Sequence, residues 1–208
     1  EGTVAYDLWG VGWDTTSEDG VRIARSPLAE LDDLKTYRFP DPEDPRWTAG
    51  LAARIARNGG RLAVAGSLGF CLWERYWVLR GFERAMEDLI EEPALVEDVL
   101  DRIVAVNTVL LRRLASVGVD WLHTGDDFGA QRGLQYSADT WRRFFKSRYA
   151  TLWAVARATG LPQSHHSCGD VRSILDDLVE IGLNMLNPVQ TRAMPPEELA
   201  DRWGDRLA

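Results

Sequence analysis

The sequence has little lysine, little cysteine and no long apolar run. Of its 208 residues, two are lysine and two are cysteine, Cys71 and Cys168. Two cysteines are too few for a framework of disulfide bonds, so we expect a reducing, cytoplasmic location. No apolar stretch approaches the ~18 residues of a membrane span. The first residues also lack the basic and then apolar pattern of a signal peptide.

Positive charge is scarce as well. Lysine and arginine total 24 against 32 acidic residues, which gives a formal net charge of −8. Nucleic acids and anionic membranes are bound through basic patches, so we expect neither as a partner. The chain also lacks a Gly-x-Gly-x-x-Gly fingerprint and a P-loop, so no motif points to a nucleotide-binding sheet. With 45% hydrophobic residues, its composition is typical of an ordinary globular protein.

Helical segments that end in glycine alternate with short apolar strands. The clearest strands follow Gly118, Gly160 and Gly182, and a looser example spans residues 61–66. Glycine commonly ends a helix because it accepts a positive φ without a Cβ clash. Strands separated by helices predict βα units and a parallel sheet, as in a doubly wound α/β fold or a (β/α)8 barrel. Polar residues stand at the far ends of the strands, where barrel enzymes gather their chemistry.

Local signals define several elements. Pro93 is suited to the first position of a long helix, and Ser137 and Asp170 are suited to cap two others. Residues 4–9 are a candidate strand, and residues 10–28 read as a hairpin or a long loop. We find no break in composition that demands a second domain.

The pair His166-x-Cys168 has the sharpest chemical meaning. Residues two apart on an extended strand point to the same side, so these side chains can converge on one metal ion. A histidine and a cysteine together suit zinc, and a catalytic zinc needs about three protein ligands. The alternative is a histidine bonded to backbone beside a buried, inert thiol.

Two adjacent carboxylates, Asp126 and Asp127, follow the strand that contains His123 and precede a glycine-rich turn before Gln131. Such a pair can hold a cation, accept protons or orient a substrate, and close charges split their pKa values. Asp and Gly are also ordinary turn residues. His123 and Gln131 add polarity that a plain turn does not need.

Further polar residues occupy comparable positions. Asn187 and Gln190 lie at and just after another strand end, where an amide can bind a ligand or tie down a loop. Asp7 lies on an apolar candidate strand, and burying an unpaired carboxylate is costly. It is therefore either a functional carboxylate or the partner of an arginine.

Taken in order, these segments resemble the uroporphyrinogen decarboxylase superfamily over nearly the whole chain, most closely its zinc- and corrinoid-dependent methyltransferase branch. The resemblance is carried by residues 7–10, 66–69 with the aromatic helix to 81, 125–129, 166–170 and 187–190. It implies a (β/α)8 TIM barrel, which typically needs ~250 residues. We therefore expect residues 1–208 to be one partial barrel domain that lacks the first and last βα units, with Glu1 after the first unit and a strand beginning at residues 205–208.

The resemblance also implies a cofactor and a partner. In this branch a His-x-Cys pair and a later cysteine bind zinc, which holds a thiol as the thiolate. The thiolate takes a methyl group from a methyl-corrinoid (cobalamin) on a corrinoid protein. His166 and Cys168 match the first two ligands, but no cysteine follows Cys168. We then expect the third ligand to lie in a further C-terminal part of the barrel. Alternatively, the zinc recruits Asp126, Asp127 or His123.

The remaining site residues follow from the same resemblance. We expect Asp126 and Asp127 to be catalytic. The residues expected to contact the small-molecule acceptor are Asp7, His123, Gln131, His165, Asn187 and Gln190. The acceptor stays open among coenzyme M, another thiol and a folate-type pterin.

Two other functions stay open. One is uroporphyrinogen decarboxylase activity in tetrapyrrole biosynthesis. Such decarboxylases carry an Arg-rich N-terminal segment, absent from this chain, and tend to have Asp-Ser where this chain has Asp126-Asp127. A second carboxylate there would repel a polycarboxylate substrate. The other is a non-catalytic barrel that binds a corrinoid protein.

Overall fold

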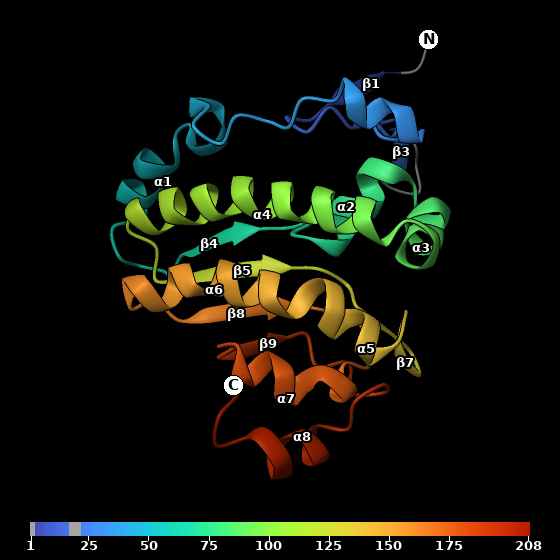
Figure 1. Cartoon of the computed structure of the whole chain (residues 1–208). Helices are drawn as coiled ribbons and strands as arrows, with labels where there is room; N and C mark the ends of the chain where they lie inside the picture. The colour runs from blue at the N-terminus through green and yellow to red at the C-terminus, as the bar shows by residue number, and fades with distance from the viewer. Residues whose placement is uncertain (1–2, 17–21) are drawn as a thin grey trace.

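A four-stranded parallel sheet forms the centre of the computed structural model (Figure 1). The structure describes residues 3–16 and 22–208, so Glu1 and the expectation attached to it lie outside the described residues. The strands are adjacent in the order β4 (Ala65–Leu68), β5 (Trp121–Gly125), β8 (Gln163–His166) and β9 (Met185–Asn187). Each pairs in parallel with the next, as the glycine-ended helices predicted.

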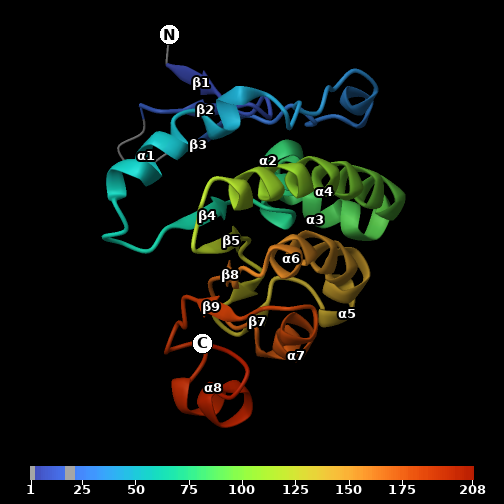
Figure 2. The ribbon, with the colours of Figure 1, turned by 90° about the vertical axis from the view of Figure 1, so that its left-hand side faces the viewer.

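Three connecting helices lie on one side of this sheet (Figure 2). They are α4 (Pro93–Ser116), which packs on β4 and β5, α6 (Ser147–Thr159), which packs on α4 and β8, and α7 (Arg172–Glu180), which links β8 to β9. A doubly wound fold would place helices on both faces. Helices on a single face are the arrangement of a (β/α)8 barrel, with the other face turned toward the barrel interior.

The remaining elements surround this layer. A three-stranded antiparallel sheet precedes it, and the hairpin β6–β7 follows β5. The bounds of these elements are β1 (Val4–Tyr6), β2 (Gly12–Asp14), β3 (Arg22–Arg25), η1 (Leu31–Lys35), η2 (Pro45–Thr48), α1 (Leu51–Asn58), α2 (Trp73–Arg80), α3 (Phe82–Glu91), β6 (Gly129–Ala130), β7 (Gly133–Leu134), α5 (Ala138–Trp141), η3 (Arg142–Lys146) and α8 (Pro196–Trp203). The candidate strand at residues 4–9 therefore ends early, at Tyr6.

The predicted helix signals lie where expected, with one shift. Pro93 is the first residue of α4, and the Ser137 hydroxyl accepts the Thr140 N–H at 3.0 Å to cap α5. Asp170 lies one position before the cap of α7 and accepts the Arg172 N–H at 3.0 Å. Within residues 3–16 and 22–208, no helix combines the length and apolarity needed to cross a membrane.

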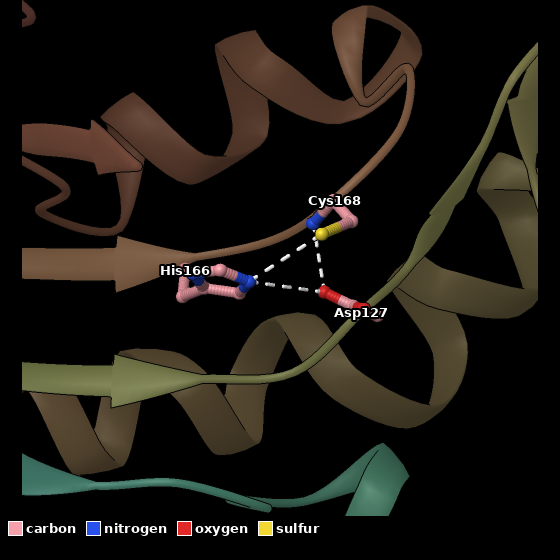
Figure 3. Close-up of side chains that lie close together, drawn as sticks. All are labelled: Asp127, His166 and Cys168. Atoms are coloured by element: carbon pink, nitrogen blue, oxygen red, sulfur yellow. Dashed lines mark hydrogen bonds and ion pairs between the residues drawn. The ribbon is translucent and has the colours of Figure 1, made fainter. Parts of the chain in front are cut away.

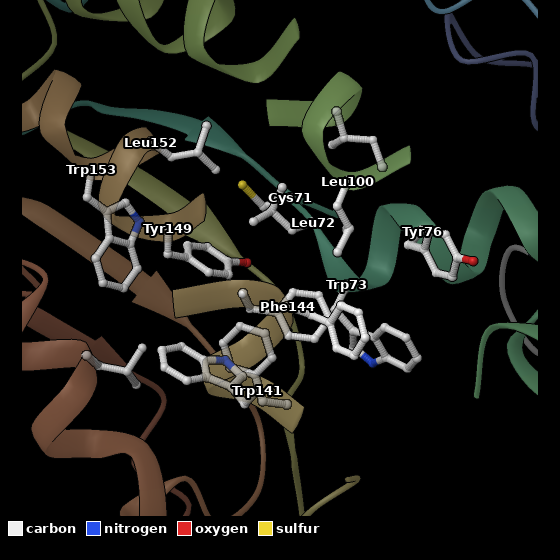
Figure 4. Close-up of a cluster of buried hydrophobic side chains, with 14 of the residues drawn as sticks. Cys71, Leu72, Trp73, Tyr76, Leu100, Trp141, Phe144, Tyr149, Leu152 and Trp153 are labelled. Carbon is white, nitrogen blue, oxygen red and sulfur yellow. The ribbon is translucent and has the colours of Figure 1, made fainter. Parts of the chain in front are cut away.

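Side chains alternate between the two faces of the strands. Thr124 and His165 face the helices, where the Trp153 indole N–H donates to Thr124 Oγ1 at 3.0 Å. Trp153 and Tyr149 belong to a buried aromatic cluster between α6, α2 and the sheet (Figure 4). His123, Ser164 and His166 occupy the alternate positions and face the barrel interior. The aromatic layer fixes the strands, so their carboxyl ends hold defined positions.

The edge of the sheet beyond β9 is also paired. The Ala208 N–H donates to Asn184 O, and the Leu186 N–H donates to Ala208 O, both at 2.9 Å. This is the hydrogen-bond pattern of a parallel pair. Of the strand expected at residues 205–208, only Ala208 pairs with β9 in this way, because Asp205 and Arg206 lie in the turn that follows α8.

Candidate metal centre

Asp127, His166 and Cys168 converge at the carboxyl ends of β5 and β8 (Figure 3). His166 Nε2 lies 3.5 Å from Cys168 Sγ and 3.5 Å from Asp127 Oδ1. The three ligand atoms all lie within 4.8 Å of one another. The spacing of His166 and Cys168 therefore does bring their side chains together. Of the three residues named as possible third ligands, Asp127 is the one in this group.

Two glycines make this convergence possible. The loop after β5 crosses the loop after β8 at Gly129 and Gly169, backbone against backbone. A Cβ on Gly129 would lie 2.4 Å from Cys168 O, and a Cβ on Gly169 would lie 2.3 Å from Gly129 C. Gly169 also has a left-handed φ of +77°. This contact places the Cys168 N–H 2.7 Å from Asp127 Oδ1, to which it donates.

Two amides, one at the end of β9 and one in the segment after it, hold the centre. Asn187 Oδ1 lies 3.0 Å from His166 Nδ1. Because one ring nitrogen is engaged there, the other faces the remaining two side chains. Gln190 Oε1 accepts the Gly169 N–H at 3.0 Å and lies 3.4 Å from Gln131 Nε2. The predicted Asn187, Gln190 and Gln131 are therefore brought to the rim of the centre.

Carboxyl groups of Glu74, Asp126 and Asp127 crowd the centre. Burial and the charges of Asp126 and Asp127 raise the pKa of Glu74, on α2, to about 8. Burial and the nearby Asp127 raise the pKa of the Cys168 thiol. Sequence reasoning did not single out Glu74, because it stands among aromatic residues in the segment that ends at residue 81. A cation would relieve this crowding of carboxyl groups and favour the thiolate.

The donor set fits zinc. Thiolate sulfur, imidazole nitrogen and carboxylate oxygen are its usual ligands, and three protein ligands leave a position open for a reactant. The hydrogen bond from His166 to Asn187 is the kind of support that metal-bound histidines have. Asp127 and His166 remain accessible, with 36% and 38% of their side chains exposed.

Asp126 requires a correction, since its carboxylate is fully buried and already saturated. It accepts the N–H groups of Cys71, Leu72, Trp73 and Glu74 at 2.6–3.0 Å. It also accepts the Tyr149 hydroxyl. Burial raises its pKa to about 6, in opposition to these donors. Asp126 anchors the N-terminus of α2 with both carboxylate oxygens engaged, which leaves Asp127 as the accessible carboxylate of the pair.

His165 also requires a correction. It is fully buried on the helix side of β8, stacked on Phe128 with ring centroids 5.3 Å apart, and its Nδ1 lies 2.8 Å from Thr124 Oγ1. Burial, together with the charges of His123 and His166, lowers its pKa to about 3. We therefore remove His165 from the residues expected to contact substrate and assign it to the core.

Asp7 is the partner of an arginine. Its Oδ2 lies 3.2 Å from Arg75 Nη1, while its Oδ1 accepts the Trp9 and Val11 N–H groups at 2.9 and 3.0 Å. The Arg75 guanidinium also lies 4.9 Å from the centroid of the Trp9 ring. Of the two roles left open for Asp7, this geometry supports the structural one.

Comparison with known protein families shows which family the chain belongs to. The sequence model of uroporphyrinogen decarboxylase (URO-D) matches residues 3–207. The chain belongs to the uroporphyrinogen decarboxylase family. The predicted family and its (β/α)8 fold class are thereby confirmed, and the described residues supply four adjacent strands of that fold.

A solved structure supports the same fold for this URO-D family chain. The methyltransferase from Methanosarcina mazei superposes with a TM-score of 0.71 at 18% sequence identity. The match covers 96% of this chain and 58% of that protein, so the chain spans less than two thirds of its relative. At this identity the likeness shows the fold alone. No curated protein sequence matches the chain.

Proposed function

We propose that this chain carries the metal centre of an enzyme that moves a methyl group from a methyl-corrinoid to a thiol or similar acceptor. The corrinoid would be presented by a partner corrinoid protein. The observation that carries the proposal is the convergence of Asp127, His166 and Cys168 within 4.8 Å. Similarity in fold to a methyltransferase supports it.

Different residues of the chain would bind the metal, orient its ligands and position the reactants. His166, Cys168 and Asp127 would hold zinc, which when bound lowers the pKa of a thiol so that the thiolate is present at neutral pH. Asn187 orients the His166 ring, and the Gly129–Gly169 crossing keeps Asp127 beside Cys168. The centre lies at the carboxyl ends of the strands, where a barrel mouth can exclude water and align the reactants.

Decarboxylation of a porphyrinogen is the alternative reaction within the family. The charge at the centre disfavours it, because the Asp127 carboxylate would face the carboxylates of such a substrate. A non-catalytic role, in which the barrel binds a corrinoid protein without turnover, is the third candidate. It predicts a stable complex but no transfer of the methyl group.

Zinc analysis tests the proposal first. We expect one equivalent of zinc per chain in the wild type and in Cys71→Ala, which removes the buried cysteine outside the centre, and loss of zinc in Cys168→Ser. Less than one equivalent in the wild type, or full zinc in Cys168→Ser, would overturn the metal assignment.

Activity assays then separate the candidates. Incubation with methylcobalamin and a thiol should yield methylated thiol, detected by chromatography, in a zinc-dependent manner. Decarboxylated porphyrinogen without methyl transfer would instead establish the alternative reaction. Binding of a corrinoid protein with neither product would establish the non-catalytic role.

A further inference from the structure

A row of polar side chains crosses the interior face of the sheet next to the metal centre. Ser67 pairs in register with His123, and His123 pairs in register with Ser164. Residues in register on parallel strands point to the same side, so the three side chains form one row. His123 Nδ1 lies 2.7 Å from Ser164 Oγ, which confirms this orientation.

The metal centre occupies the next row of the same face. His166 lies two residues beyond Ser164 on β8 and in register with Asn187 on β9. Two residues of a strand span ~7 Å. A small molecule whose reactive atom lies at the centre can therefore reach His123 with its other end.

The polarity of the first row is unusual for its place. The interior of a (β/α)8 barrel is filled mainly by branched aliphatic side chains. Here Ser164 is buried, His123 is half-buried and Ser67 is exposed, so His123 and Ser67 remain accessible from the interior face. The contact with Ser164 engages one of the two nitrogens of His123. The second nitrogen and the Ser67 hydroxyl are suited to a bound molecule.

Glycine keeps the way between the two rows open. A Cβ on Gly125 would lie 3.5 Å from His166 Cβ and 3.9 Å from Gly69 Cα, which are ordinary contact distances. Gly125 is also absent from the glycines with positive φ. Neither backbone conformation nor a clash demands glycine here, in contrast to Gly129. The missing side chain instead leaves space between the metal centre and His123.

We propose that Ser67, His123 and Ser164 form a subsite that hydrogen-bonds the polar end of the methyl acceptor while its sulfur lies at the metal centre. The inference rests on the proposed function and names its acceptor class: a short thiol with an uncharged hydrogen-bonding group two or three carbons from the sulfur. An uncharged end fits because burial and the nearby His166 lower the pKa of His123, which keeps the ring neutral. The carboxylate of Asp127 disfavours an anionic end.

Two thiols of the same size test the subsite. 2-Mercaptoethanol and 1-propanethiol differ in having a hydroxyl or a methyl group at the far end. With cobalt(II) in place of zinc, Cys168 already gives a sulfur-to-metal absorption band, and the rise of this band on thiol addition reports affinity without turnover. We expect the wild type to bind 2-mercaptoethanol about tenfold more tightly than 1-propanethiol, as one net hydrogen bond allows.

Substitutions in the row of Ser67, His123 and Ser164 test whether it causes the preference for 2-mercaptoethanol. His123→Leu and Ser67→Ala should lose the preference and keep their affinity for 1-propanethiol. Ser116→Ala, on the exposed end of α4, is the matched control and should retain it. Gly125→Ala should bind cobalt normally but weaken both thiols severalfold. Equal affinities in the wild type, or a preference that persists in both row variants, would overturn the subsite.

The outcomes separate the subsite from the proposed function. Cobalt binding without thiol preference removes the subsite and leaves the metal centre. Absence of cobalt binding removes the metal centre, and the subsite is then judged in the metal-free chain by the ring-nitrogen NMR signals of His123. A shift on addition of 2-mercaptoethanol, lost in Ser67→Ala, supports the subsite, and no shift in the wild type overturns it.

Discussion

Asn187 Oδ1 lies 3.0 Å from His166 Nδ1 and thereby determines which nitrogen of the ring faces Asp127 and Cys168. Loss of such a partner typically costs 10–100-fold in metal affinity. We therefore expect Asn187→Leu to weaken zinc binding by about this factor, measured by competition with a chromophoric chelator. Asn187→Asp keeps an acceptor at the same place and should stay within a few-fold of the wild type. Equal affinities in the wild type and Asn187→Leu would contradict this role.

The contact between Gly129 and Gly169 predicts a strong effect of a single methyl group. In Gly129→Ala the Cβ would meet Cys168 O at 2.4 Å, so the two loops must move apart. We expect a loss of about 2 kcal/mol or more in the free energy of unfolding, measured by urea denaturation, together with loss of zinc. Gly69→Ala is the matched control, since a Cβ there has no neighbour within 4 Å among the described residues. Zinc binding by a stable Gly129→Ala protein would show that the crossing does not position the ligands.

The adjacent aspartates should lose stability to very different extents on the same substitution. Asp126→Ala leaves four backbone N–H groups and the Tyr149 hydroxyl without their acceptor, so we expect a loss of more than about 3 kcal/mol in the free energy of unfolding. Asp127→Ala removes a partly exposed side chain and should cost about 1 kcal/mol, yet it should weaken zinc binding. Urea unfolding and chelator competition on both variants check the pair. Similar stability losses in the two proteins would contradict the assignment.

The parallel sheet and the His166–Cys168 pair could be predicted because both depend on local patterns, whereas the choice of a barrel came from the family resemblance. Glycine-ended helices separate the strands, and the two-residue period of a strand predicts His166 and Cys168 on one side. β8 ends at His166, so the loop crossing at Gly129 and Gly169 completes the placement of Cys168. The same period excludes His165, which lies on the opposite face from His166. Applied strictly, it would have removed His165 from the predicted site.

Other parts of the site depend on contacts that no local pattern records. Glu74 approaches Asp127 because Asp126 ties the start of α2 to the end of β5. Two adjacent carboxylates look alike in the sequence, and the saturation of Asp126 becomes visible only with the backbone donors in place. The partner of Asp7 likewise lies 68 residues away, at Arg75. Sequence reasoning could state that a partner was needed but could not name it.

Burial of His165 predicts a dependence of stability on pH. Its pKa is about 3 in the folded protein against about 6.5 when unfolded, so between these values the unfolded chain binds more protons. Stability from this group is complete above pH 6.5 and falls by about 1.4 kcal/mol per unit as the pH drops below it. His165→Gln retains a hydrogen-bonding side chain without this titration. Asp126, whose pKa is raised to about 6, makes stability rise as the pH falls, and it does so equally in the wild type and in His165→Gln. The difference between the pH slopes of the two proteins therefore reports His165. Urea unfolding at pH 7, 6 and 5 should show the steeper loss in the wild type, and parallel slopes would place His165 in contact with solvent.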